Sequence, residues 1–285
     1  MTDLPPTHRF QLLDTITPEQ QAFLDHYGFL HFEGVAKPDE VDMILEEMDQ
    51  LEQNWRQEGR RKVNGVPLFW GRGPGEKTWL QRFAFSSAFS RRIREFVHHS
   101  RFEPIRTLIG ADARVGDQEK DGVVINRYIN LPGSVYPKLG WHTDGLRDLF
   151  YLKMPKQMLN VGLHLDDCGP ENGGLRLIPC SHSQGFWSMC FRKFYFVSHK
   201  ADPKEICVST RRGDLTVHDG RLWHRVAQSS RKGLASIRRT MYVPYLTGPY
   251  QPKSETSGTP GYHFLGALMR RWQTRKFRPA KNLGV

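Results

Sequence analysis

The chain has little cysteine and no long apolar run among its 285 residues. No stretch approaches the roughly 18 consecutive apolar residues that a membrane-spanning helix needs, so we expect no membrane span. The opening residues MTDLPP have neither a basic start nor an apolar segment behind them, which argues against a signal peptide. These two absences favour a cytoplasmic protein.

The four cysteines are too widely spaced for a Cys-x-x-Cys metal motif or a dense disulfide framework. They are Cys168, Cys180, Cys190 and Cys207. We predict reduced thiols that lie in the core or in strands. A phosphate loop is also missing, because no Gly-Lys-Ser/Thr follows the glycine-rich residues 71–75, which are interpreted as a turn or a flexible lid.

The chain has fewer acidic than basic residues. There are 41 Lys and Arg residues against 30 Asp and Glu residues, which gives a net charge of +11. Residues 253–285 hold seven of the basic residues and only one acidic residue, Glu255. A basic balance favours anionic partners such as phosphates, carboxylates, coenzyme A, an acyl carrier or nucleic acid, and a solvated basic tail is the alternative.

The periodicity of apolar residues changes along the chain. Helical spacing predicts a helix that Thr17 caps and Gly28 ends, a second helix over 37–58 and helical structure over 89–110. Residues 29–32 form a short predicted strand. From Val123 onward, short apolar runs alternate with turn residues, which is typical of an antiparallel sandwich or barrel. The predicted strands cover 123–129, 140–143, 159–165, 174–179, 215–218, 221–227 and 235–245.

Residues 141–145 (WHTDG) carry the strongest chemical signal. Residues two apart in a strand point to the same side, so His142 and Asp144 can reach one metal ion together. A third ligand from a distant strand would complete a face of two imidazoles and one carboxylate, which suits octahedral iron(II) and leaves three open positions. The triplet alone is weak evidence, since cupin-like and zinc sites use the same pair. A second triplet, His164-Leu-Asp166, lies inside an apolar run and is interpreted as strand.

The third ligand has two candidates, His218 and His224, in residues 213–224 (GDLTVHDGRLWH). A turn at 229–233 predicts a hairpin of strands 221–228 and 235–245, which places His224 across from about position 238 or 239. A guanidinium there could hold the far carboxylate of 2-oxoglutarate through two parallel hydrogen bonds. Arg238 and Arg239 point to opposite faces, so only one can do this, and an exposed basic strand is the alternative.

The order of motifs resembles the phytanoyl-CoA dioxygenase family of iron(II)- and 2-oxoglutarate-dependent oxygenases over most of the chain. The matching segments are 17–20 (TPEQ), 27–34 (YGFLHFEG), 37–40 (KPDE), 142–145 (HTDG), 165–167 (LDD), 171–175 (ENGGL), 178–185 (IPCSHSQG), 213–214 (GD), 219–224 (DGRLWH) and 237–242 (IRRTMY). The resemblance implies a mainly β fold with flanking α-helices, built on a double-stranded β-helix (jelly-roll, cupin-like) core.

The resemblance also implies roles for single residues. His142, Asp144 and His224 would hold the iron and form the catalytic centre, whereas His218 falls where the family usually has an apolar residue. Arg238 would clamp 2-oxoglutarate, and Asn126 would contact the same co-substrate. The chain departs from the family pattern at Val226, where a small hydroxylated residue is common. His182 is then expected to be a structural turn residue.

Together these implications predict one oxygenase domain over 1–285, with a mainly helical part (1–110), a β-helix core (111–247) and a basic extension (248–285). It would use Fe(II), 2-oxoglutarate and O2 to hydroxylate or otherwise oxidise a C–H bond of a small-molecule or carrier-linked substrate, with release of succinate and CO2. The presence of Asp144 favours hydroxylation over halogenation, because family-like halogenases lack that carboxylate.

Two other functions remain open at this point. A nucleic-acid oxidative demethylase is supported by the charge but lacks a base-reading module. The other is a non-catalytic metal-binding β-fold module, against which the presence of all three ligands together with Arg238 argues. In the oxygenase reading, residues 60–79 and 146–157 are expected to build or cover the substrate pocket, which we expect to take an anionic or carrier-linked molecule.

Overall fold

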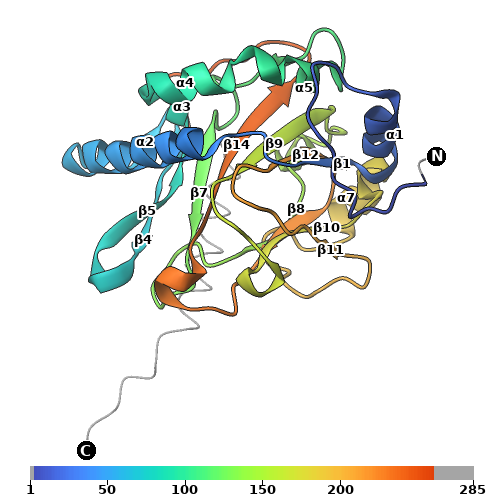
Figure 1. Ribbon diagram of the computed structural model, residues 1–285. Helices are drawn as coiled ribbons and strands as arrows, with labels where there is room; N and C mark the ends of the chain where they lie inside the picture. Colours follow the sequence, from blue (N-terminus) through green and yellow to red (C-terminus); the bar gives the residue numbers. More distant parts are fainter. Residues whose placement is uncertain (1–2, 260–285) are drawn as a thin grey trace, which may run out of the picture.

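The computed structural model describes residues 3–259, and the basic residues of the expected tail from 260 onward lie outside this range. The described residues form two antiparallel β-sheets with helices packed on the outside (Figure 1). The expected mainly β fold with flanking helices is confirmed.

The larger sheet has the order β1-β12-β9-β14-β7-β5-β4, and β6 pairs with the end of β14. Its strands are β1 (Phe29–Phe32), β4 (Phe69–Arg72), β5 (Thr78–Phe83), β6 (Arg114–Val115), β7 (Val124–Tyr128), β9 (Met158–His164), β12 (Leu215–Asp219) and β14 (Arg238–Leu246). The smaller sheet has the order β11-β10-β13-β8, formed by β8 (Leu139–His142), β10 (Gly174–Leu177), β11 (Ile206–Cys207) and β13 (His224–Ala227). A separate two-stranded ribbon joins β2 (Lys62–Val63) and β3 (Val66–Pro67).

The helices begin and end where local chemistry predicts. In α1 (Pro18–Tyr27), Thr17 and Gln20 form a reciprocal capping box, and Gly28 ends the helix with a φ of 82°. The long helix α2 (Pro38–Gln57) follows β1. The expected helical stretch 89–110 is broken into shorter pieces, because Ser90 caps a new helix and Pro104 starts another. The remaining α-helices are α3 (Ser86–Phe89), α4 (Arg91–Val97), α5 (Glu103–Thr107), α6 (Leu146–Phe150) and α7 (Phe186–Phe191). Short 3-10 turns cover Pro74–Glu76, Ser100–Phe102, Pro170–Asn172, Ser181–Ser183 and Gly233–Ser236.

The two faces of the larger sheet have different characters. On β14, Met241 and Val243 belong to the main hydrophobic cluster, which also contains Ile44 and Met48 of α2. Figure 1 shows α2 and α4 lying along this outer side of the sheet. Because side chains alternate along a strand, Arg238, Thr240 and Tyr242 point to the opposite face, toward the smaller sheet. The interior between the sheets is therefore rich in polar side chains.

The predicted hairpin of strands 221–228 and 235–245 is wrong. β13 pairs with β8 and β10, whereas β14 pairs with β7, β9 and β6, so the two strands belong to different sheets. The connection between them contains a 3-10 turn, Gly233–Ser236, and crosses from one sheet to the other. The residues before 111 also contribute more sheet than expected, because β1, β4 and β5 extend the larger sheet, and Gly71 of the supposed loop lies in β4.

All four cysteines are free thiols. Cys168 is buried and Cys207 lies in β11, as expected. The prediction is wrong for Cys180, which is exposed in a turn with a φ of 63°, and for Cys190, which is half-buried in helix α7. Among the described residues, no helix has the length and apolar character that crossing a membrane would require.

Candidate active site

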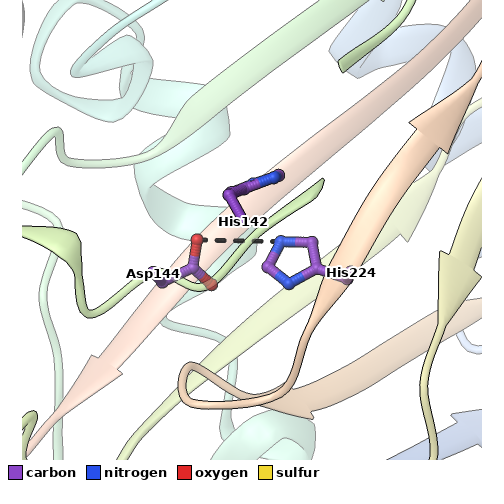
Figure 2. A group of neighbouring side chains, drawn as sticks. All are labelled: His142, Asp144 and His224. Atoms are coloured by element: carbon purple, nitrogen blue, oxygen red, sulfur yellow. Dashed lines mark ion pairs between the residues drawn. The ribbon is translucent and has the colours of Figure 1, made fainter. Parts of the chain in front are cut away.

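His142, Asp144 and His224 lie together between the two sheets (Figure 2). Each offers one ligand atom, and these atoms all lie within 4.8 Å of one another. His142 ends β8, Asp144 follows it by two residues, and His224 begins β13, where the register places it directly opposite His142. Pairing of β8 with β13 therefore brings the HxD segment and the distant histidine to one point.

Backbone carbonyl groups set the orientation of both imidazoles. The Nδ1 of His142 lies 2.8 Å from the carbonyl oxygen of Gly140, and the Nδ1 of His224 lies 2.9 Å from that of Leu222. A carbonyl oxygen can only accept, so each Nδ1 carries the proton and donates. Each Nε2 then keeps its lone pair, which is the state that metal coordination needs.

Burial and charge keep these groups in metal-binding form. Burial lowers the pKa of His142, and burial together with the neighbouring His142 ring holds the pKa of His224 well below its ordinary value. Burial alone would raise the pKa of Asp144, but the rings of His224, His218 and His142 together hold it far below its usual range. Two neutral imidazoles and one carboxylate, all on one side, match the ligand set of a non-haem iron(II) site and fit that ion.

The backbone of Asp144 is held by its amide, which donates to the carbonyl oxygen of Gly220 at 2.7 Å. A methyl group at Gly220 would lie 2.6 Å from the Met158 side chain, so Met158 would have to move to admit a larger residue there. The two oxygens of the carboxylate have different neighbours, one from each sheet. Its Oδ1 is 3.8 Å from the Nε2 of His224, and its Oδ2 is 3.1 Å from the Nδ2 of Asn160.

A cavity of about 980 Å³ opens onto the three side chains. Apolar groups such as Tyr136, Leu139 and Phe196 form much of its wall. Its charged lining is mainly basic, with Arg82, Lys120, Lys138 and Lys232 against Asp121 and Asp144. Burial, with the nearby charges of Lys138 and Arg225, lowers the pKa of His199 on the same wall to about 4. The cavity is large enough for a drug-sized molecule and has a positive field.

Arg238 lies close to this cavity but lines a separate small one of about 20 Å³, which shares Tyr128, Val226 and Tyr242 with the large cavity. It is 4% exposed and packs its guanidinium over the Tyr128 ring. Its Nη2 donates to the carbonyl oxygens of Pro137 and Ala227. Its Nε and Nη1 are buried and have no hydrogen-bond partner among the described residues. A buried guanidinium with two unused donors fits a carboxylate ligand.

Arg239 points the other way and pairs with Asp166 through two hydrogen bonds. Asn126 lies in β7, where its register partner is Thr240, and it lines the large cavity. Its Oδ1 is buried without a partner among the described residues. The structure thus places both residues expected to contact 2-oxoglutarate on the interior face of the larger sheet.

The expected pocket segments contribute less than the sequence suggested. Of residues 60–79 only Phe69 lines the large cavity, and of residues 146–157 only Leu146 does. The loop 130–138 and Phe196, whose ring centroid lies 4.9 Å from that of His142, form the wall instead. No local sequence signal marks these residues, because loops lack periodicity.

The other histidines have separate roles. His164 is buried in β9 and its Nε2 lies 3.0 Å from the Thr216 hydroxyl, away from the metal cluster. His182 contacts the carbonyl oxygen of Asp25 at 3.1 Å in a turn beside α1. A side chain at Gly28 would collide with the His182 ring at 2.4 Å, which accounts for glycine at that helix end. His218, the other candidate for the third ligand, is buried next to Asp144 but is not part of the ligand cluster.

Three comparisons place the chain among known proteins. Residues 24–233 match the family model for phytanoyl-CoA dioxygenase (PhyH). No curated protein sequence matches the chain. Many solved structures share its fold.

Three of these structures show the extent of the similarity. AviO1 from Streptomyces viridochromogenes Tue57 is 18% identical, with a TM-score of 0.56 over 81% of this chain and 94% of its own. The non-haem alpha-ketoglutarate-dependent epimerase SnoN from nogalamycin biosynthesis is 20% identical, with a TM-score of 0.56 over 81% of this chain and 84% of its own. HygX from Streptomyces hygroscopicus, solved with nickel and 2-oxoglutarate bound, is 18% identical, with a TM-score of 0.59 over 82% of this chain and 87% of its own.

The structural matches establish the fold, and the family model establishes the relationship. That model covers well over half of the sequence and includes all three residues of the metal cluster. The chain belongs to the phytanoyl-CoA dioxygenase family of non-haem iron- and 2-oxoglutarate-dependent dioxygenases.

Proposed function

We propose that this protein uses Fe(II), 2-oxoglutarate and O2 to oxidise a C–H bond of a small, anionic molecule, most simply by hydroxylation, with release of succinate and CO2. The observation that carries the proposal is the convergence of two imidazoles of fixed tautomer and one carboxylate on a cavity of about 980 Å³. The bound iron would supply the activation of dioxygen.

The protein's own residues would bind, orient and shield. The Nε2 atoms of His142 and His224 and the Oδ1 of Asp144 would hold the metal on one face. The unused Nε and Nη1 of Arg238 would bind the far carboxylate of 2-oxoglutarate, and Asn126 would contact the same molecule from β7. Val226 lines both cavities, so its apolar side chain would pack against the co-substrate at the position where the family often has a hydroxylated residue.

The shape and charge of the large cavity support the choice of substrate. The lining of the cavity includes Lys120, Lys138 and Lys232, and its basic residues outnumber its acidic ones. A carboxylate or phosphate on the substrate would therefore be attracted. SnoN was solved with Fe3+, alpha ketoglutarate and nogalamycin RO, which supports a substrate of natural-product size.

The membership of the larger sheet supports a single domain. β1, β4 and β5, from the first 110 residues, belong to the same sheet as β7, β9, β12 and β14. We therefore propose that the described chain works as a single oxygenase domain, with the basic segment after 247 as an extension of it.

The test is an anaerobic titration of the purified protein with Fe(II) and 2-oxoglutarate. The chelate of co-substrate and iron should produce a weak visible charge-transfer band in the wild type, and no band in His224→Ala. Succinate formation from 2-oxoglutarate in air should require the same residue. A wild-type protein that binds iron tightly yet gives neither the band nor succinate would contradict the proposal and favour a non-catalytic metal-binding module.

A further inference from the structure

The two oxygens of the Asp144 carboxylate have different surroundings. Oδ1 faces the imidazole of His224 at 3.8 Å, on the side of the ligand cluster. Oδ2 faces the larger sheet, where the Nδ2 of Asn160 donates to it at 3.1 Å and the Nε2 of His218 lies 3.4 Å away. One oxygen is therefore available to a metal ion, while the other is engaged by the protein.

Asn160 and His218 come from neighbouring strands and act on the same atom. They are register partners across β9 and β12, so their side chains stand side by side on the interior face of the larger sheet. His218 is 1% exposed. The two histidines of the cluster come instead from β8 and β13 of the smaller sheet. The Asp144 carboxylate thus contacts side chains from both sheets.

His218 is not placed as a fourth ligand. The described residues with ligand atoms within 4.8 Å of one another are His142, Asp144 and His224 alone. The His218 ring approaches the His224 ring with centroids 4.6 Å apart, and its Nε2 lies 3.4 Å from Oδ2, the other oxygen of the carboxylate, without forming a hydrogen bond to it. Its neighbour Asn160 offers that oxygen an amide N–H, which donates and is not a metal ligand.

We propose that Asn160 and His218 are positioning residues that hold Asp144 so that it presents a single oxygen, Oδ1, to the metal. This inference rests on the proposed function, since it requires iron at His142, Asp144 and His224. A carboxylate free to rotate can bind a metal through both oxygens and would then occupy a position needed by 2-oxoglutarate or dioxygen. The Asn160 hydrogen bond to Oδ2, together with the His218 ring whose Nε2 lies 3.4 Å from the same oxygen, opposes this and fixes the side chain in one orientation.

The variants that test the proposal remove the polar groups beside Oδ2 while keeping the volume. Asn160→Leu deletes the amide, and His218→Phe deletes the ring nitrogens. The metal-free proteins should keep the circular dichroism spectrum of the wild type. Each change should weaken Mn(II) affinity, measured from the electron paramagnetic resonance signal of free Mn(II), by about 10- to 100-fold. His218→Gln, which keeps an N–H donor near the position of Nε2, should recover most of the affinity.

The visible spectrum of the Co(II)-loaded protein gives a readout that general destabilisation does not change. If Asp144 becomes bidentate, the coordination number rises and the Co(II) bands of Asn160→Leu and His218→Phe should weaken and shift. The matched control is Thr216→Val, which alters the next inward-facing residue of β12 and touches none of the three ligands. It should bind Mn(II) within about twofold of the wild type, with an unchanged Co(II) spectrum.

The outcomes separate this inference from the function on which it rests. If the wild type binds Mn(II), Asp144→Ala does not, and both Asn160→Leu and His218→Phe bind as tightly as the wild type with the same Co(II) spectrum, the positioning role is refuted while the metal site stands. If the wild type itself binds neither Mn(II) nor Co(II), both the metal site and the positioning role are refuted.

Discussion

His142 and His224 are direct partners across the antiparallel strands β8 and β13, and their ring centroids lie 4.1 Å apart. Each ring is fixed by a hydrogen bond to the carbonyl of the residue two positions earlier in its own chain segment. The pair is therefore built into the smaller sheet before any ligand binds. A metal ion between them would link β8 to β13 and stabilise the folded state.

We expect added Fe(II) or Mn(II) to raise the melting temperature of the wild type, and a chelator to reverse the effect. At a free metal concentration of 100 times Kd the stabilisation is about 2.7 kcal/mol. His142→Ala and His224→Ala should lose nearly all of it, because each removes one of the three ligands. Calorimetry with and without metal measures this, and a full shift in either variant would show that the ion binds elsewhere.

Arg238→Ala should weaken 2-oxoglutarate binding by about 10- to 100-fold, since hydrogen bonds to charged groups contribute about 1.5–3 kcal/mol. Arg238→Lys should recover only part, because an ammonium group cannot make the paired contact. Anaerobic calorimetric titration of the Mn(II)-loaded protein gives the affinities. Arg239→Ala is the control, as Arg239 pairs with Asp166 on the opposite face, and its 2-oxoglutarate affinity should stay near that of the wild type. Equal losses in both variants would refute a specific clamp.

The sequence predicts those parts of the site that depend on local geometry. The alternation of side chains in a strand is enough to separate Arg238 from Arg239. It also predicts that His142 and Asp144 lie together, although β8 ends at His142 and Asp144 reaches the site from the following turn. The same alternation places His218 on the inward face of β12 and Asn160 on the inward face of β9. Asn160 was missed, and His218 was considered only as a metal ligand, because the register that brings β12 beside β9 is set by packing over a long sequence separation.

Sheet membership could not be predicted in the same way. Strands 221–227 and 235–245 are close in sequence and separated by turn residues, so local rules favour a hairpin. In the structure they belong to different sheets: Arg238 is the register partner of Tyr128 in β7, and His224 that of His142 in β8. The cavity wall at 130–138 and Phe196 likewise comes from loops whose positions depend on the finished core.

Gly140→Ala should lower the free energy of unfolding by about 1–3 kcal/mol, the usual cost of overpacking. A methyl group at this position in β8 would lie 2.4 Å from the carbonyl oxygen of Phe196. The segment cannot easily move away, because the Phe196 amide donates to Trp141 and the Trp141 amide donates to Ser198. Urea unfolding gives the measurement. Gly185→Ala is the control, since nothing lies within 4 Å of its added methyl group, and a cost equal to that of Gly140→Ala would rule out the steric explanation.

His164 predicts how stability changes with pH. Burial is the main cause that lowers its pKa to about 3, assisted by the nearby His31 and His218 and opposed by Asp214. In the unfolded chain the pKa of a histidine is about 6.5, so between pH 6.5 and 3 the unfolded state binds one more proton at this position. Stability should therefore fall as the pH is lowered through this window, by up to about 1.4 kcal/mol per pH unit from this residue.

His164→Gln removes the titrating group, so its stability should depend less steeply on pH than that of the wild type below about pH 6. Urea unfolding midpoints between pH 7 and 5, with a chelator present to remove any metal contribution, measure the two slopes. Thr216→Val removes the hydroxyl that contacts His164 but keeps the imidazole. It should lower stability at every pH while preserving the wild-type slope. Parallel curves for the wild type and His164→Gln would mean that this histidine is protonated in the folded protein or that its imidazole reaches solvent.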